Sequence, residues 1–299
     1  DEDIIPHHEF PPIELPAVTT QLFELLRRRW MIFRRDKSQV WLHLAMLVGF
    51  PLLVAIFALD GIKPLRALST YQDQNIGVEL AKQAKHQLEQ LNAGSLVSGL
   101  IMLQVVLVTL MASNNAAREI ASERLILERE KLGGLSPLAY VGSKVIFLGV
   151  FVLAQSLWMG LFVEMITGGL PGDLVIKLAL LVLASAAMTS VCLGISATSR
   201  TPEKATILSI YLVGFQLPLS GAVLTLPDWL ENWVQPLIAA FWSWSGSLTS
   251  MRSTAFYDAV KQVTATDLVA PTIAGFVLFV HVIIGLSMSL VGVQKSQWE

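Results

Sequence analysis

Long apolar runs alternate with polar connections along the chain, and six of these runs are long enough to cross a bilayer. An α-helix rises about 1.5 Å per residue, so about twenty apolar residues span a hydrocarbon core of about 30 Å. The predicted spans are 40–59, 93–111, 141–166, 174–197, 205–226 and 268–293. The pattern therefore predicts an all-α membrane protein with six transmembrane helices.

A charged, helix-patterned segment separates the second run from the third. Residues 114–144 read NNAAREIASERLILEREKLGGLSPLAYVGSK, between the uncharged runs 93–111 and 145–163. Charged side chains are costly in lipid, so this segment must project into water as a hairpin. Such a projection is what a driven transporter needs when a soluble partner pushes on its spans. Arg124 and Glu128, four residues apart, also allow a simple surface pair of about 0.2–0.5 kcal/mol.

The polar segments outside the spans divide the rest of the chain. We expect residues 1–19 to form a proline-rich linker, 20–37 an amphipathic helix on the cytosolic surface, and 38–299 the membrane domain. A bare topology anchor is the alternative for 20–37. A polar helical stretch is predicted at 78–91. The last outer loop, 227–267, contains four tryptophans, which indicate short helices re-entering the outer leaflet or interfacial anchoring alone.

The basic residues set the expected orientation. With the N-terminus in the cytosol, fourteen of the 21 Lys and Arg lie inside, against seven in the opposite orientation. The fourteen are Arg27, Arg28, Arg29, Arg34, Arg35, Lys37, Arg118, Arg124, Arg129, Lys131, Lys144, Arg200, Lys204 and Lys295. We therefore expect a multi-pass protein of the inner (plasma) membrane with both termini cytosolic. The net charge of −2 gives no reason to expect nucleic acid as a partner.

No pattern for catalysis by this chain is present. The sequence has no G-x-x-x-x-G-K-[ST] phosphate loop and no H-E-x-x-H. Cys192 is its single cysteine, and His43 and His281 are isolated in different spans. Each histidine is interpreted as a packing residue. We expect no catalytic residue, no metal and no cofactor bound by the chain itself.

Three stretches resemble the permeases of type-2 ABC exporters, especially the G subfamily. The first stretch is Gln21–Arg28 leading to Arg34-Arg35-Asp36. The second, in the hairpin, is the most specific and comprises Glu123-Arg124, Arg129-Glu130, Ser136-Pro137, Tyr140 and Lys144. The third is Pro218-Leu219-Ser220-Gly221 with Leu226–Leu230 and Pro236. The last outer loop has no cysteine or sequon and the first outer loop is long, which suggests a bacterial relative. The resemblance implies a connecting helix at 20–37, a coupling helix in the hairpin and a re-entrant outer loop.

The resemblance also implies partners and site residues. An ABC ATPase domain, fused upstream or separate, would bind ATP and Mg²⁺, and a second permease copy would complete a homodimer or heterodimer in lipid. The expected coupling residues are Glu123, Arg124 and Arg129 as docking contacts, with Ile120 and Leu127 packing into an ATPase groove. The expected substrate pathway, between the second and fifth spans, includes Leu103, Gln104, Phe215 and Gln216. Apolar surroundings favour a lipid-like or amphipathic substrate moved by alternating access.

Alternatives remain open at this point. Amides within a membrane often bond neighbouring helices, so Gln104 and Gln216 are equally well interpreted as structural contacts. An integral-membrane transferase using His43 and His281 is a second function class, although such enzymes gather several polar residues at one face. A membrane anchor for a fused sensory domain is a third, and it leaves the charged hairpin unexplained.

Overall fold

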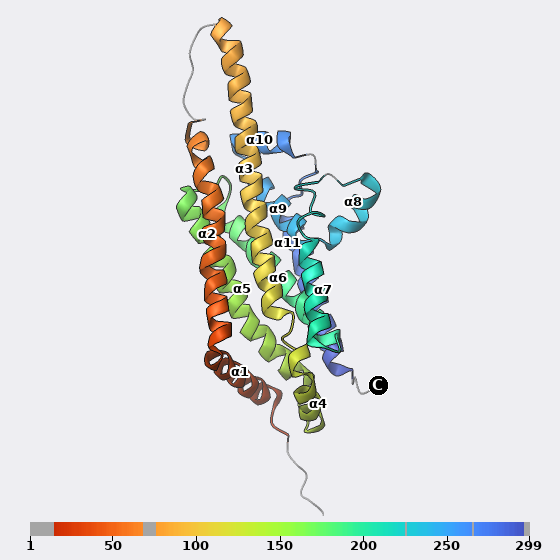
Figure 1. Ribbon diagram of the computed structural model, residues 1–299. Helices are drawn as coiled ribbons and strands as arrows, with labels where there is room; N and C mark the ends of the chain where they lie inside the picture. Colours follow the sequence, from red (N-terminus) through yellow and green to blue (C-terminus); the bar gives the residue numbers. More distant parts are fainter. Residues whose placement is uncertain (1–14, 68–75, 225, 265, 296–299) are drawn as a thin grey trace, which may run out of the picture.

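The computed structural model describes residues 15–67, 76–224, 226–264 and 266–295, in which every regular element is helical. The first fourteen residues of the predicted linker lie outside these ranges. In chain order the helices are α1 Val18–Arg35, α2 Lys37–Ala67, α3 Ile76–Ala116, η1 Ala121–Glu123, α4 Arg124–Leu132, α5 Pro137–Thr167, α6 Leu174–Thr198, α7 Pro202–Gly214, α8 Asp228–Val234, η2 Gln235–Leu237, α9 Ala239–Thr249, α10 Ala255–Val263 and α11 Pro271–Gln294 (Figure 1). The prediction of an all-α protein is confirmed.

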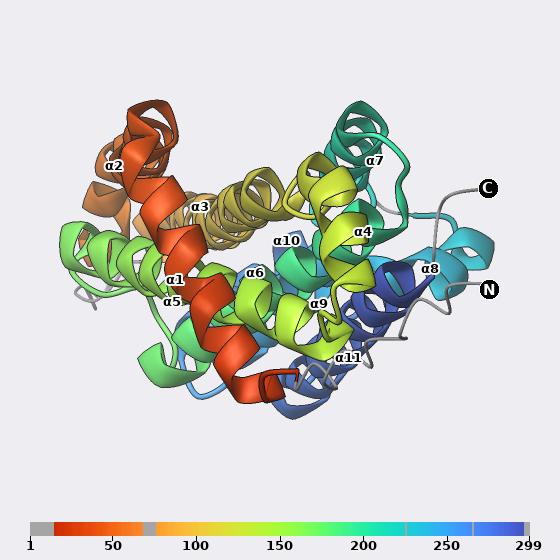
Figure 2. The same cartoon turned by 90° about the horizontal axis from the view of Figure 1, so that it is seen from below.

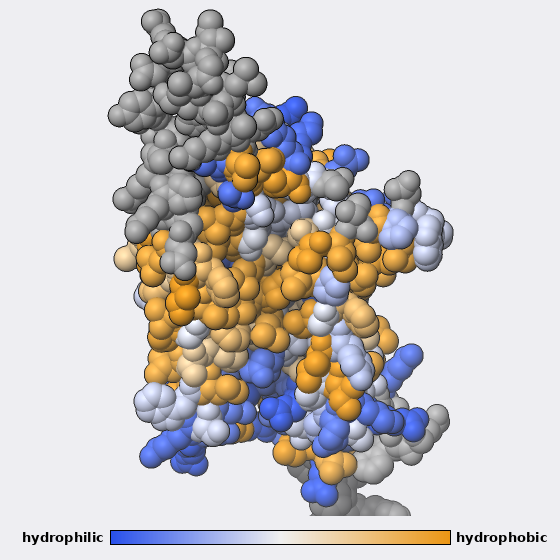
Figure 3. All heavy atoms as spheres, turned by 45° about the horizontal axis from the view of Figure 1, so that its top comes forward, coloured by the Kyte–Doolittle hydropathy of each residue, from blue (hydrophilic) through white to orange (hydrophobic). Residues whose placement is uncertain are grey.

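The long helices run side by side, and the two ends of this bundle differ. We call the end with α1, α4 and the last turn of α11 the hairpin end, and the end with α8 and α10 the opposite end (Figure 1). Within the described residues, five helical stretches are long and apolar enough to cross a membrane: Lys37–Leu59, Leu91–Leu132, Pro137–Thr167, Leu174–Thr198 and Pro271–Gln294. Apolar side chains form a broad band on the face in Figure 3, with hydrophilic ones gathered below it. The chain is therefore a multi-pass membrane protein.

The predicted span 205–226 differs from the structure. Helix α7 ends at Gly214 after 13 residues, and residues 215–224 form turns. A helical proline clashes with the carbonyl four residues earlier, and Pro218 stands four residues after Gly214. At 1.5 Å per residue α7 is about 20 Å long, too short for a hydrocarbon core. The expected count of six full spans is therefore not confirmed among the described residues.

Two other helices meet the predictions in part. The predicted span 93–111 and the polar stretch 78–91 lie in one uninterrupted helix, α3. Helix α1 packs its apolar side on α5, where the rings of Trp30 and Phe147 lie 5.1 Å apart edge to face. In the view from the hairpin end, α1 crosses in front of α5 (Figure 2). Helix α1 is thus held on the bundle by packing against α5 as well as by its covalent connection to α2.

The loop 227–267 contains a short helix that enters the bundle. Helix α9 packs against α3, α6 and α11, and Trp244 is fully buried there. The Trp244 Nε1 donates to the carbonyl and the hydroxyl of Ser98, both at 3.2 Å. Trp229 and Trp233 on α8 are instead exposed. The tryptophans therefore have different roles: α9 uses one as a buried contact, and α8 presents two at the surface.

Helices α6 and α11 pack closely along their length. A Cβ added at Gly285 would lie 2.4 Å from the Ser190 carbonyl carbon, and one at Gly292 would lie 2.8 Å from that of Ala197. Small residues allow such close backbone approach in membrane helices. This pair presents its C-terminal ends together at the hairpin end, where they meet α4.

Candidate functional site

The hairpin has one face buried in the chain and one face exposed. Ile120 and Leu127 are fully buried and belong to a core cluster that includes Tyr140, Leu193 and Val293. On the other face, Leu125, Ile126 and Leu132 are 70%, 53% and 86% exposed. These three apolar side chains, together with exposed Arg129, form what we call the α4 outer face. Its apolar area is left uncovered by the chain.

Arg124 ties the start of α4 to the ends of two spanning helices. Its guanidinium donates to the carbonyls of Ala197 and Ser199, the latter at 3.2 Å, and to Gly292 O at 3.4 Å. These carbonyls lie at the C-terminal ends of α6 and α11, where the helix dipole favours a cation. Lys131, at the other end of α4, donates to Val293 O at 2.8 Å. Both ends of α4 are therefore fastened to the α6–α11 pair.

A buried cluster of charges joins the hairpin to α1 and α5. The Glu119 carboxylate accepts from both Arg29 Nε and Arg29 Nη2, the second at 2.7 Å, and from Lys144 Nζ at 3.0 Å. Lys144 Nζ also donates to Glu123 at 2.6 Å, and the Tyr140 hydroxyl donates to the same carboxylate at 3.2 Å. We call Arg29, Glu119, Glu123, Tyr140 and Lys144 the charge cluster. Two cations face two carboxylates, so the cluster is neutral.

Two arginines of α1 form ion pairs with the hairpin: Arg28 with Glu130, and Arg29 with Glu119. Hydrogen bonding to Glu130 raises the pKa of Arg28 above its ordinary value, although partial burial opposes the rise. Burial also opposes the charged form of Arg29, but the hydrogen bond and attraction of Glu119 outweigh it and raise the pKa of Arg29. Arg28 and Arg29 thus hold α1 on the hairpin with charges that do not titrate near neutral pH.

The structure places the five predicted coupling residues on different faces. Arg129 is exposed, as a docking contact requires. Glu123 is engaged by Lys144 and Tyr140, and Arg124 by backbone carbonyls, so both make contacts within the chain. Ile120 and Leu127 are enclosed by the chain itself and are not on a surface that a partner groove could cover. Both faces of the hairpin carry apolar and charged residues, so its periodicity alone did not identify the exposed one.

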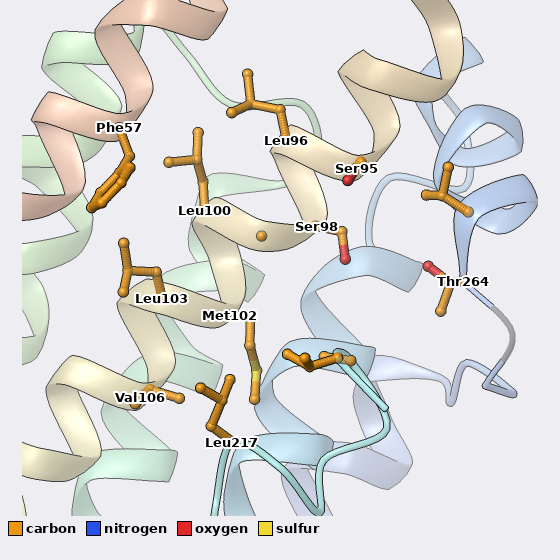
Figure 4. Close-up of a pocket in the computed structure, with 14 residues that line it drawn as sticks. Phe57, Ser95, Leu96, Ser98, Leu100, Met102, Leu103, Val106, Leu217 and Thr264 are labelled. Carbon is orange, nitrogen blue, oxygen red and sulfur yellow. The ribbon is translucent and has the colours of Figure 1, made fainter. Parts of the chain in front are cut away.

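A second feature, an apolar pocket, lies towards the opposite end between α2, α3 and the turns after α7. Its volume is about 550 Å³. Its apolar side chains include Phe57, Leu100 and Leu103, and its hydroxyls come from Ser95, Ser98 and Thr264 (Figure 4). None of the described residues that line it is charged. The lining can therefore hold an apolar group and offers hydroxyls for a neutral polar group.

Of the four predicted pathway residues, only Leu103 lines this pocket. Gln216 is buried, where its Oε1 accepts from Ala240 N at 2.9 Å and its Nε2 donates to Leu212 O at 3.3 Å. It thus joins the end of α7 to the first turn of α9. This contact fits the interpretation of Gln216 as a structural residue rather than a substrate contact. Gln104 is buried with no partner for its Nε2 among the described residues, and Phe215 is exposed.

Small and hydroxyl residues of the pocket were missed from the sequence. Ser95, Ser98 and Gly99 share a side of α3 that faces the pocket, and no described atom lies within 4 Å of a Cβ added at Gly99. Their spacing of three and four residues was the available signal. It was not used because serine and glycine in a span are typical of helix packing as well.

The comparison with protein families covers both features. A family model described as ABC-2 type transporter matches residues 20–245, from α1 through the hairpin and the pocket-lining part of α3 into α9. The match includes most of the chain. No curated protein matches it.

Proposed function

The chain belongs to the ABC-2 type transporter family, and from this membership we propose that it is the membrane-spanning part of an ATP-driven exporter. It is a permease component and has no phosphate loop of its own. In the proposed complex an ABC ATPase domain, fused or separate, binds ATP and Mg²⁺. A second permease copy completes the dimer.

The α4 outer face is the observation that supports this proposal most directly. A membrane protein gains nothing from Leu125, Ile126 and Leu132 standing exposed at a charged end unless a protein covers them. On its other side α4 is bonded to α6 and α11 through Arg124 and Lys131. A push on the outer face therefore reaches the spanning helices through short, directional contacts.

The proposed orientation puts the hairpin end in the cytosol. Arg34, Arg35 and Lys37 at the end of α1 and the start of α2, and Lys204 on α7, are exposed there. Cytosolic segments of membrane proteins carry such an excess of basic residues. In this proposed orientation the α4 outer face is open to a cytosolic ATPase, at the inner membrane of a bacterial cell.

The proposed substrate is lipid-like or amphipathic. The pocket has the volume of a small-molecule site, and its uncharged lining would bind an anion or a sugar poorly.

The proposed dimer has a candidate contact surface on α7. This helix leaves Ile207, Leu208 and Tyr211 exposed, a surface that a second copy would cover. In the proposed cycle ATP-driven closure shifts the pathway from inward-open to outward-open, and the substrate binds the two states with different affinities.

The alternative functions receive no support from the positions of the histidines. His43 Nδ1 lies 2.8 Å from Gln39 O, and His281 Nδ1 lies 2.8 Å from Val277 O, each within its own helix. The two belong to α2 and α11, which are not among the closely packed helix pairs, so the histidines give no sign of a common transferase site. A membrane anchor would not need α4 to be bonded at both ends.

The test is to purify the native complex through this chain in mild detergent, return it to lipid and measure ATP turnover. We expect an ATPase to accompany the chain and its turnover to be abolished by orthovanadate. If wild-type chain brings no ATPase with it, the exporter proposal fails and the anchor function takes its place.

A further inference from the structure

One side chain at the hairpin end joins three separate backbone segments. Gln21, in the first turns of α1, donates through Nε2 to Pro16 O at 2.9 Å and to Gly134 O at 3.4 Å. Its Oε1 accepts from Ser136 N at 2.8 Å. Pro16 precedes α1, Gly134 lies in the turn between α4 and α5, and Ser136 is the N-cap residue of α5. We call these contacts the Gln21 bridge.

The chemistry of the bridge requires a glutamine. A side-chain amide has donors and an acceptor on one group, which lets it bond to carbonyls and to an N–H at once. Glutamate has no donor for the two carbonyls, and asparagine is one methylene shorter. All three partners are backbone atoms, so the bridge fixes the path of the chain itself.

The turn beside Gln21 is shaped to fit against the start of α1. Gly134 has φ +91°, and a Cβ there would meet Leu15 Cδ2 at 2.4 Å. Glycine adopts this left-handed conformation without steric cost, and it leaves room for Leu15 against the turn. Further along α1, Arg28 pairs with Glu130 of α4, and Arg29 pairs with Glu119 before η1. Helix α1 is thus attached to three parts of the hairpin: the residues before η1, helix α4, and the turn between α4 and α5.

We infer that Gln21 is a positioning residue for coupling: it holds the α4–α5 turn on α1, so that α1, α4 and the start of α5 move as one body. This inference rests on the proposed function. A push on α4 reaches α6 and α11 directly, and the Gln21 bridge passes the same displacement to α1 and α5. Without the bridge, the turn at 133–136 absorbs part of the motion.

The first arm of the test detects the contact itself by hydrogen exchange of the full complex. Gln21→Ala removes all three bonds, and Gln21→Glu keeps only the acceptor for Ser136 N. We expect exchange at Ser136 N–H to rise about tenfold in Gln21→Ala and less in Gln21→Glu, with exchange in the middle of α5 unchanged. Glu24→Ala is the control, since Glu24 is exposed one turn along α1 and should change nothing. Equal exchange in Gln21→Ala and wild type would overturn the inference.

The second arm measures coupling without a known substrate. In wild type, trapping the complex with ATP and orthovanadate should change hydrogen exchange in the turns 215–224 at the opposite end. In Gln21→Ala we expect ATP turnover to persist while this response falls by at least about half. A full response despite faster exchange at Ser136 would make the bridge merely structural and overturn the inference. Absence of ATP turnover in wild type would defeat the proposed function instead, and the first arm would still decide the contact.

Discussion

At the hairpin end, Arg29 and Lys144 bond to Glu119 and Glu123, whereas the pocket towards the opposite end is lined by apolar side chains and a few hydroxyls. Ion pairs and charge-assisted hydrogen bonds are directional, so the charge cluster holds one arrangement. Apolar contacts are non-directional, so the pocket can bind apolar molecules of different shape and its lining side chains can rearrange. The difference suits a molecule that transmits force at one end and accommodates a cargo at the other.

Glu119→Gln should be the most damaging change, because it removes the carboxylate on which two buried cations converge. The side chains of Arg29, Glu119 and Lys144 are at most 10% exposed. Breaking a buried ion pair from one side costs about 3–5 kcal/mol, since it leaves uncompensated charge. We expect a large loss of thermal stability in detergent. Glu24→Gln, which breaks only an exposed pair with Arg27, should cost at most about 1 kcal/mol; equal losses would refute the comparison.

Gln216→Leu tests whether the opposite end also has a directional contact. Losing this amide leaves the Ala240 N–H without its acceptor at the start of α9, which should cost about 1–3 kcal/mol of stability. Gln104→Leu is the matched control, because the Nε2 of Gln104 has no partner among the described residues. That change should be neutral or stabilising. If thermal unfolding shows Gln104→Leu to be the more harmful, the assignment of the two amides is wrong.

Gly99→Phe should affect function with the smallest effect on stability. No described atom lies within 4 Å of a Cβ at Gly99, so the ring can enter the pocket. We expect stability to change by no more than about 1 kcal/mol, the range of a glycine replacement in a helix, and lipid stimulation of ATP turnover to fall severalfold. Gly49→Phe, on an exposed and equally open position of α2, is the control. Unchanged stimulation in Gly99→Phe would exclude the pocket from the pathway.

Much of the fold could be predicted because membrane spans are long apolar runs, and α2, α5, α6 and α11 lie where such runs were found. The early end of α7 was missed because hydropathy does not register Pro218, which stands inside an apolar run. The insertion of α9 was predicted only as a possibility for the tryptophan-rich loop. Its depth depends on tertiary contacts such as Trp244 with Ser98, which no local pattern encodes.

The candidate site could be predicted by segment more readily than by residue. The hairpin was identified because a dense run of charge between two apolar runs has few physical explanations. Within it, Ile120 and Leu127 are as apolar as Leu125 and Ile126, and only the packing of Tyr140, Leu193 and Val293 decides which pair is buried. Glu119 pairs with Arg29 on α1 and Lys144 on α5, which are distant from it in the sequence. A local sequence pattern could not predict these ion pairs.

The central claim is that the α4 outer face receives the force of an ATPase, and a double variant of that face tests it most directly. Leu125→Asp with Ile126→Asp charges two exposed positions that make no part of the core. ATPase retention and vanadate-sensitive turnover would be measured on the complex purified through this chain. Val175→Asp, at an exposed apolar position in the first turn of α6 at the opposite end, is the control. We predict that the double variant keeps its thermal stability and loses the ATPase or its turnover, while the control keeps both; a double variant with full turnover would contradict the account.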